Sequence, residues 1–222
     1  MARIGITNVG KYQGGNNGGY FTLSDDGDSA TVRFLYNQPD GSDIDFFLVH
    51  EVEIEGRRRY VSCNAVDEDG NMHTDDCPLC KSGNKPKEKL FLQLVDENDL
   101  NTVKVWERGS KFVAKIVTYL NKFGDLSSIP IEIVRRGKKG DTSTQYEFLP
   151  GAPDGRNLKD FAQRQEIEGT IVIKASKQDM INMLNNNYST GSNNTQNEQP
   201  AYTNNYAPRT NRGSRTTSTD IF

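Results

Sequence analysis

Four residues between positions 50 and 80 have the types and the spacing of a metal site. Two residues separate Cys77 from Cys80, which allows two thiolates to bind one ion from a tight turn. Cys63 offers a third sulfur, and His50 completes the pattern H-x12-C-x13-C-x2-C. Thiolate ligands together with an imidazole suit zinc. We therefore expect one structural Zn²⁺ ion, bound by His50, Cys63, Cys77 and Cys80.

The second histidine of the chain, His73, is the alternative fourth ligand, in the pattern C-x9-H-x3-C-x2-C. It lies in a polar segment, 67–76, that reads as a loop. His50 instead belongs to a predicted strand, and Cys63 ends the next one, so a hairpin would bring the two to matching ends. Local geometry therefore favours His50.

Other chemistries fit these cysteines less well. A redox pair needs a helix N-terminus behind a βα unit, and residues 81–86 are not helical in pattern. A disulfide scaffold needs an even number of cysteines, and the chain has three. A catalytic zinc site would keep a position open for water, beside acid and base groups that the sequence does not offer. We expect a closed structural site and no enzyme.

The chain has 222 residues, of which 34% are hydrophobic. That share is low for a packed globule of this length, so we expect part of the chain to be unfolded. Residues 1–19 are rich in glycine and asparagine and predict a flexible arm, and the polar residues 185–222 predict a disordered tail. Residues 20–184 would form one core with a zinc-binding lobe at about 50–85, a lobe too polar to bury a core of its own.

No apolar run is long enough to cross a bilayer, and the residues after Met1 lack the features of a signal peptide. Metal-spaced cysteines without a secretory signal indicate a reducing compartment. We therefore expect a cytoplasmic protein without a membrane partner.

One long amphipathic helix is predicted in the middle of the chain. Phe112, Ile116 and Leu120 recur every four residues, Ser110 is a suitable N-cap, and Gly124 can end the helix. The other periodic segments are mostly short and alternate as strands do. Strands are predicted at 20–24 and 30–36 (a pair), 46–52 and 59–63 (a pair), 90–95, 101–107, 129–136, 143–148 and 169–174, and short helices at 157–162 and 177–184. This order predicts a mainly β (α+β) fold, an OB-fold barrel with an inserted zinc lobe.

The net charge is −3, so a nucleic-acid site would depend on local segregation of charge. Between positions 102 and 139 there are nine basic residues and three acidic ones. Alternation places Lys104 and Trp106 on one face of a strand, and Tyr119 and Tyr146 are interleaved with the bases. Cations that follow phosphates, beside rings that stack on unpaired bases, are what a single-strand groove needs. The basic residues are Lys104, Arg108, Lys111, Lys115, Lys122, Arg135, Arg136, Lys138 and Lys139.

Several segments resemble one family, the zinc-containing single-stranded-DNA-binding (helix-destabilising) proteins of tailed phages, T-even type. The resemblance runs through 30–35, 46–50, 60–63 and 76–80, where the H-x12-C interval and C-P-x-C are kept, and it covers about residues 20–150. It implies that Trp106 stacks on DNA, that Phe91 lies near DNA, and that Tyr146 contacts it.

The resemblance also has departures. The N-terminal arm lacks the family's basic cluster, which bears on cooperative self-association along DNA, and the strongly acidic C-terminal segment is missing. The last residues, Asp220, Ile221 and Phe222, instead look like the acidic and aromatic tip of bacterial single-strand-binding proteins. That likeness implies replication and recombination proteins as partners of the tip.

From residues and resemblance together we expect a protein that coats single-stranded DNA during phage replication, recombination and repair, in the cytoplasm of the infected bacterium. The alternative is a zinc-ribbon module that binds proteins of a replication complex. The expected DNA contacts are Trp106, Phe91, Tyr146, Tyr119, Lys104, Arg108, Lys111, Arg135, Arg136, Lys138, Lys139, Arg57, Arg58 and Arg59.

Overall fold

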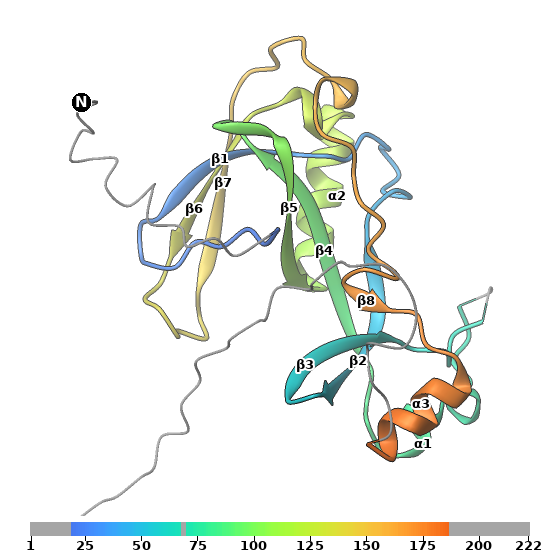
Figure 1. The fold of residues 1–222 in the computed structure, drawn as a ribbon. Helices are drawn as coiled ribbons and strands as arrows, with labels where there is room; N and C mark the ends of the chain where they lie inside the picture. The colour runs from blue at the N-terminus through green and yellow to red at the C-terminus, as the bar shows by residue number, and fades with distance from the viewer. Residues whose placement is uncertain (1–18, 68–69, 187–222) are drawn as a thin grey trace, which may run out of the picture.

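The computed structural model describes residues 19–67 and 70–186, which form a large β core with a small lobe at one end (Figure 1). Eight strands within these described residues make one mixed sheet, so the mainly β prediction is confirmed. The strands are β1 (Ser29–Phe34), β2 (Phe46–Ile54), β3 (Arg57–Ser62), β4 (Lys87–Asp96), β5 (Asp99–Gly109), β6 (Ile131–Arg136), β7 (Gln145–Pro150) and β8 (Val172–Ile173). The helices are α1 (Pro78–Lys81), α2 (Lys111–Phe123) and α3 (Lys177–Leu184).

Strand β4 joins the core to the lobe. Its residues 89–96 pair with β5 along one edge. On the other edge its first residues, 87–90, pair with β2, and its last residues, 94–96, pair with β1. The order is β7-β6-β1-β4-β2-β3-β8, with β5 on the second edge of β4. One long strand therefore carries the core sheet at one end and the β2–β3 hairpin of the lobe at the other.

The main core lies between the sheet and α2. Phe34 of β1, Leu92 of β4 and Ile131 of β6 are fully buried against Ile116 and Leu120 of the helix. These helix residues are four apart, so they lie on one face, as the sequence predicted. The burial of this face explains why α2 is the one long helix in the described chain.

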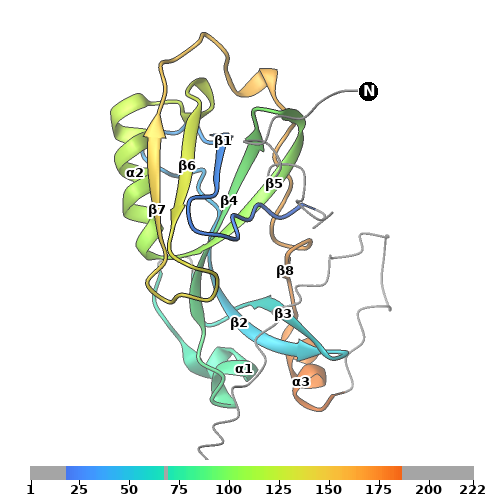
Figure 2. The same cartoon turned by 90° about the vertical axis from the view of Figure 1, so that its left-hand side faces the viewer.

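The expected closed barrel is not seen among the described residues, because the sheet is open between β7 and β5. Helix α2 occupies this side, as Figure 2 shows. Its side chains cover the free edge of β7: Lys115 Nζ donates to the carbonyl of Tyr146 at 2.7 Å, and the Tyr119 hydroxyl donates to that of Phe148 at 3.2 Å. Hydrogen bonds from these side chains thus satisfy carbonyl groups of β7 that a neighbouring strand would otherwise bind.

After β7 the chain returns along the outer face of the sheet to the lobe, and we call residues 157–173 the strap. Phe161 packs on Leu35, the residue after β1, and Ile167 and Ile171 pack over Phe91 of β4. The strap ends in β8, which pairs in parallel with β3. Both cartoon views show it running from the far end of the core down to α3 (Figures 1 and 2).

The lobe differs from its prediction, because it has a small core and includes chain from beyond residue 85. Val61 and Leu79 are buried together with Met180 and Met183 of α3. Two other predicted elements also differ from the structure. Segment 20–24 does not pair with β1 and makes only a bridge from Tyr20 to Val105. The predicted helix at 157–162 is a single 3-10 turn.

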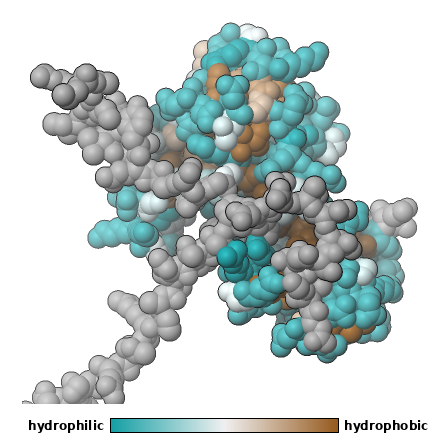
Figure 3. Space-filling model, viewed as in Figure 1, coloured by the Kyte–Doolittle hydropathy of each residue, from teal (hydrophilic) through white to brown (hydrophobic). Residues whose placement is uncertain are grey.

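Most of the surface that Figure 3 shows is hydrophilic, with apolar residues confined to small patches on the core and the lobe. None of the helices in the described segments is long and apolar enough to cross a membrane.

Candidate metal centre and adjoining cleft

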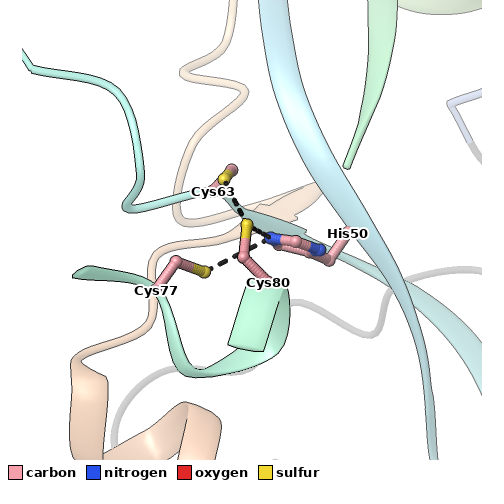
Figure 4. A group of neighbouring side chains, drawn as sticks. All are labelled: His50, Cys63, Cys77 and Cys80. Carbon is pink, nitrogen blue, oxygen red and sulfur yellow. Dashed lines mark hydrogen bonds between the residues drawn. The ribbon is translucent and has the colours of Figure 1, made fainter. Parts of the chain in front are cut away.

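The four residues of the cysteine and histidine pattern meet in the lobe (Figure 4). One ligand atom from each of His50, Cys63, Cys77 and Cys80 lies within 4.8 Å of all the others. His50 comes from β2, Cys63 follows β3, and the other two cysteines flank Pro78 and Leu79 at α1. The predicted cluster is thus present as one group of side chains.

The spacing of these atoms fits a tetrahedral ion. Bond lengths of about 2.3 Å to sulfur and 2.0 to 2.1 Å to nitrogen imply edges of about 3.8 Å between sulfurs and 3.6 Å from nitrogen to sulfur. His50 Nε2 lies 3.3 Å from Cys77 Sγ and 3.6 Å from Cys80 Sγ, and Cys63 Sγ lies 3.7 Å from Cys80 Sγ. Three sulfurs and one nitrogen could therefore hold one metal ion.

The β2–β3 register and a tight turn position these ligands. His50 stands opposite Val61, and the N–H of Cys63 bonds to the carbonyl of Leu48, so the first two ligands come to one end of the hairpin. Pro78 occupies the first turn of α1, where its missing N–H costs no hydrogen bond. The sequence predicted the hairpin but not this one-turn helix.

Burial sets the protonation of His50 and two of the thiols. His50 is fully buried, which lowers the pKa of its imidazole and favours the neutral form that a metal requires. Burial raises the pKa of the Cys63 thiol, and burial with the neighbouring sulfur of Cys63 raises that of Cys80 to about 12.

Cys77 behaves differently from the other two thiols. Burial acts to raise its pKa, but backbone N–H groups of Cys80 and Asn64 donate to its sulfur and lower the pKa overall. Cys77 is therefore the thiol that the fold itself prepares to ionise.

The alternative ligand His73 is not in the cluster. Its side chain is 55% exposed, and its Nε2 lies 2.9 Å from Asp67 Oδ2. This arrangement agrees with the loop predicted for that segment.

An open cleft of about 870 Å³ lies between the lobe and the junction of β5 with α2. Lys85, Lys87 and Glu88 line it on the side where β4 begins. Gly109, Ser110, Lys111 and Phe112 line it on the α2 side, and the remaining lining residues are Leu48, Met72, Thr74 and Pro86. Among the lining residues three are cations and one is an anion.

A set of ion pairs and hydrogen bonds fixes the lobe beside the core. Glu51 of the lobe hairpin binds Arg58 and lies 2.7 Å from Lys87 Nζ. Glu107 of β5 accepts from Lys89 Nζ at 2.6 Å and from the Tyr60 hydroxyl at 2.7 Å. Burial and Glu107 raise the pKa of Tyr60 far above its ordinary value, so its hydroxyl stays a donor.

Two of the predicted stacking aromatics are buried, which corrects the sequence analysis. Trp106 is 1% exposed and belongs to the main core, and Phe91 is fully buried under the strap. Trp106 and Lys104 were correctly predicted to share one face of β5, but that face packs on the main core at Trp106. Tyr119 and Tyr146 are half-buried and pack on that core.

Several predicted phosphate ligands hold the fold together instead. Arg135 is 8% exposed and donates to the carbonyls of Leu23, Gly137 and Lys138. Arg108 is half-buried with its guanidinium 4.0 Å from the ring centroid of Trp106.

Others are exposed or partly exposed. Arg136 pairs with Glu147, and Lys104 lies 3.8 Å from Asp96 towards the far end of β5. Lys111, Lys138, Lys139, Arg57 and Arg58 are exposed, and Arg59 is partly exposed.

Sequence reasoning missed Lys85, Lys87 and Met72 as residues of the cleft. Lys85 lies two positions before β4 and Lys87 is its first residue, whereas the basic segment predicted from the sequence lies at 102–139. Only the return of β5 along β4 brings the two lysines to the same cleft as Lys111. The predicted tip, Asp220, Ile221 and Phe222, and the N-terminal arm lie outside the described residues.

No protein-family model matches this sequence, and a search of curated proteins found no match.

Proposed function

We propose that the protein binds single-stranded DNA in the cleft between the lobe and the core, without acting as an enzyme. The observation that carries this proposal is the lining of the cleft, where Lys85, Lys87 and Lys111 surround apolar side chains. Unpaired strands need both cations for their phosphates and apolar or aromatic surface for their bases. Neither requirement depends on base identity, so little sequence preference is expected.

The three lysines supply the electrostatic part. Lys85, Lys87 and Lys111 are exposed, and the start of α2 adds the Gly109–Ser110 backbone to the same cleft. Lys111 stands in the first turn of α2, where the helix dipole disfavours a cation unless an anion is near. A phosphate in the cleft would satisfy both the dipole and the lysine.

The apolar part comes from Phe112, Met72, Leu48 and Pro86. Met72 is 51% exposed and adds accessible apolar surface to the cleft. Phe112 is the one aromatic side chain among the lining residues. We assign it the stacking role that the sequence analysis gave to Trp106, worth about 1–3 kcal/mol per base.

We assign the metal as one structural Zn²⁺ ion, held by His50, Cys63, Cys77 and Cys80. When bound it would cross-link the hairpin to α1, and so fix the lobe wall that carries Met72 and Lys85. Structural zinc sites supply about 10–16 kcal/mol of folding free energy.

The wider function follows the family resemblance. We propose that the chain coats DNA strands during phage replication, recombination and repair, with an open sheet of the OB type as scaffold. Arg57–Arg59, Lys138 and Lys139 would extend the basic surface, because Figures 1 and 2 show the β6–β7 loop at the end of the core that carries the lobe. The terminal tip would recruit partner proteins in the host cytoplasm.

A protein-binding zinc module is the second candidate. The observation that favours it is apolar surface on α3, where Ile181 is 41% and Leu184 43% exposed. Such a module would leave the lysines of the cleft without a role in DNA binding, so one experiment separates the two functions.

The experiment measures affinity for fluorescent oligo-dT over a range of salt concentrations. Changing Lys85, Lys87 and Lys111 to glutamine should weaken binding and reduce the log–log salt slope by about 2, since each phosphate contact contributes about 0.7. Changing Lys122, Lys159 and Lys174, which do not line the cleft, removes the same charge and should alter binding little. Equal losses in the two variants, or no binding by the wild type, would reject the cleft.

The metal is tested separately with the two histidines of the chain. His50→Ala should lower Zn²⁺ affinity by roughly 100-fold or more, about a quarter of the site's binding free energy. His73→Ala should leave that affinity unchanged, because His73 lies outside the cluster. Competition with a chromogenic chelator measures both, and an equal response of the two variants would contradict the assigned ligands.

A further inference from the structure

We propose that Asn84 is a positioning residue for the metal centre, which holds His50 in the tautomer that presents Nε2 to the ion. His50 Nδ1 lies 3.4 Å from Asn84 Oδ1. On the other side of the ring, Nε2 faces the sulfurs of Cys77 and Cys80. The two nitrogens of one imidazole thus have different neighbours, and Asn84 is the neighbour of the nitrogen that does not bind metal.

The orientation of the Asn84 amide is fixed by its second contact. Its Nδ2 donates to the backbone carbonyl of Glu51 at 3.0 Å. Rotating the amide by half a turn would place Oδ1 against that carbonyl, which is also an acceptor, and would lose the bond. Oδ1 must therefore face His50.

This orientation determines where the imidazole proton lies. A neutral imidazole has one N–H and one acceptor nitrogen. Asn84 Oδ1 can only accept, so it selects the tautomer with the proton on Nδ1. The lone pair then lies on Nε2, which points into the cluster. Metal-binding histidines in general donate their other N–H to such an acceptor, which fixes the ring and makes the ligand more basic.

The turn after α1 delivers Asn84 to this place. The backbone N–H of Asn84 bonds to the carbonyl of Leu79 at 3.1 Å, and Gly83 adopts φ +87° just before it. A side chain at position 83 would disfavour this left-handed conformation. The same short turn therefore holds Cys80 as a ligand and, four residues later, the group that orients His50. This inference concerns the metal site alone and stands whether or not the cleft binds DNA.

The first test compares two substitutions at one position. Asn84→Leu removes the side-chain acceptor and should weaken Zn²⁺ and Co²⁺ binding by about 10-fold. This loss is at the lower end for residues that orient a metal ligand, because the backbone carbonyl of Asn84 can also accept from His50. Asn84→Asp keeps an acceptor for Nδ1–H but loses the donor to the Glu51 carbonyl, so it should weaken binding less than Asn84→Leu does. Asn71→Leu, an exposed asparagine of the same lobe, is the control and should bind as wild type does.

Equal weakening by the leucine and aspartate variants would show that Asn84 serves only packing, and wild-type affinity of Asn84→Leu would also overturn the proposal. The second test needs no variant. Long-range ¹H–¹⁵N NMR of the metal-loaded full chain should show His50 protonated at Nδ1 and bound to metal through Nε2. A metal bond through Nδ1 would overturn the inference.

Discussion

The ring of Trp106 lies in the interior, with the rings of Phe21, Phe112 and Tyr146 set edge-on around it at centroid distances of 5.0 to 5.6 Å. Its indole N–H has no hydrogen-bond partner among the described residues. Trp106 therefore stabilises the fold through the packing of its ring, and its N–H adds no hydrogen bond. A tryptophan that alternates with lysine along a strand can thus belong to the core.

Trp106→Ala should destabilise the protein by about 3–5 kcal/mol, because it empties the centre of an aromatic cluster. Trp106→Phe should cost less, since it keeps one aromatic ring in the cluster and the N–H that it removes makes no bond. Urea denaturation of both variants measures the difference. Equal stability of Trp106→Ala and wild type would contradict the buried position.

Arg33 of β1 is fully buried on the outer face of the sheet, where it takes part in a group of ion pairs. It binds Glu97, and its Nη2 lies 2.6 Å from Asp154 Oδ2. Arg156 donates to the same carboxylate at 2.8 Å. These contacts attach the segment after β7 to the core before the strap begins.

Asp154 should make the stability of the protein sensitive to acid. Arg156, and with it Arg33, lowers the pKa of this carboxyl far below its ordinary value of 3.8. A lowered pKa in the folded state means that the stabilisation is complete above about pH 3.8 and is lost as the pH falls below it. Asp154→Asn should therefore be less stable than wild type at pH 7, and the gap should close towards pH 2.

Thermal melts from pH 7 to pH 2 check this expectation. Asp99, an exposed carboxylate at the start of β5, offers a control, since it makes no contact with Arg33 or Arg156. A gap between Asp154→Asn and wild type that stayed constant over the whole pH range would contradict the ionic role of Asp154.

Helix α3 is the element that connects the end of the strap to the metal centre. Met180 is fully buried, with its sulfur 3.7 Å from Cys77 Sγ. Ser176 and Asp179 form a capping box at its N-terminus, and Lys177 Nζ lies 2.9 Å from Asp76. Metal binding and the docking of α3 therefore stabilise the same few residues, and each should favour the other.

Met180→Ala should destabilise the lobe by about 2–5 kcal/mol and weaken metal binding, because it opens a cavity beside Cys77. Ile181→Ala, on the exposed side of the same helix, should change stability by less than about 0.5 kcal/mol. Denaturation and metal competition measure both effects. If the two variants behaved alike, α3 would not be part of the lobe's core.

At the scale of the whole molecule, local patterns correctly predicted the helix α2 and the cluster of three cysteines and one histidine that could hold a metal ion. The C-x2-C turn and the four-residue spacing of Phe112, Ile116 and Leu120 act over a few residues, so the sequence is sufficient to predict them. The strap could not be predicted, because its contacts join positions far apart in the chain, such as Phe161 with Leu35. For the same reason the face of β5 that meets the core was assigned wrongly.

The cleft likewise depends on long-range pairing. Lys87 and Lys111 are separated by the whole β4–β5 hairpin and meet only because β5 returns along β4. A basic segment read along the sequence therefore included Arg135, which is structural, and omitted Lys85. Basic residues that are close in the sequence therefore need not lie on the same surface, because antiparallel strands bring distant residues together.

Ultraviolet cross-linking of oligo-dT to the metal-loaded full chain, followed by peptide mass spectrometry, tests the proposed cleft most directly. The cleft predicts cross-links in peptides that contain Met72, Lys85–Glu88 and Gly109–Phe112, from both of its walls. Cross-links confined to α3 or to the strap, or none at a DNA concentration that saturates the protein, would contradict it.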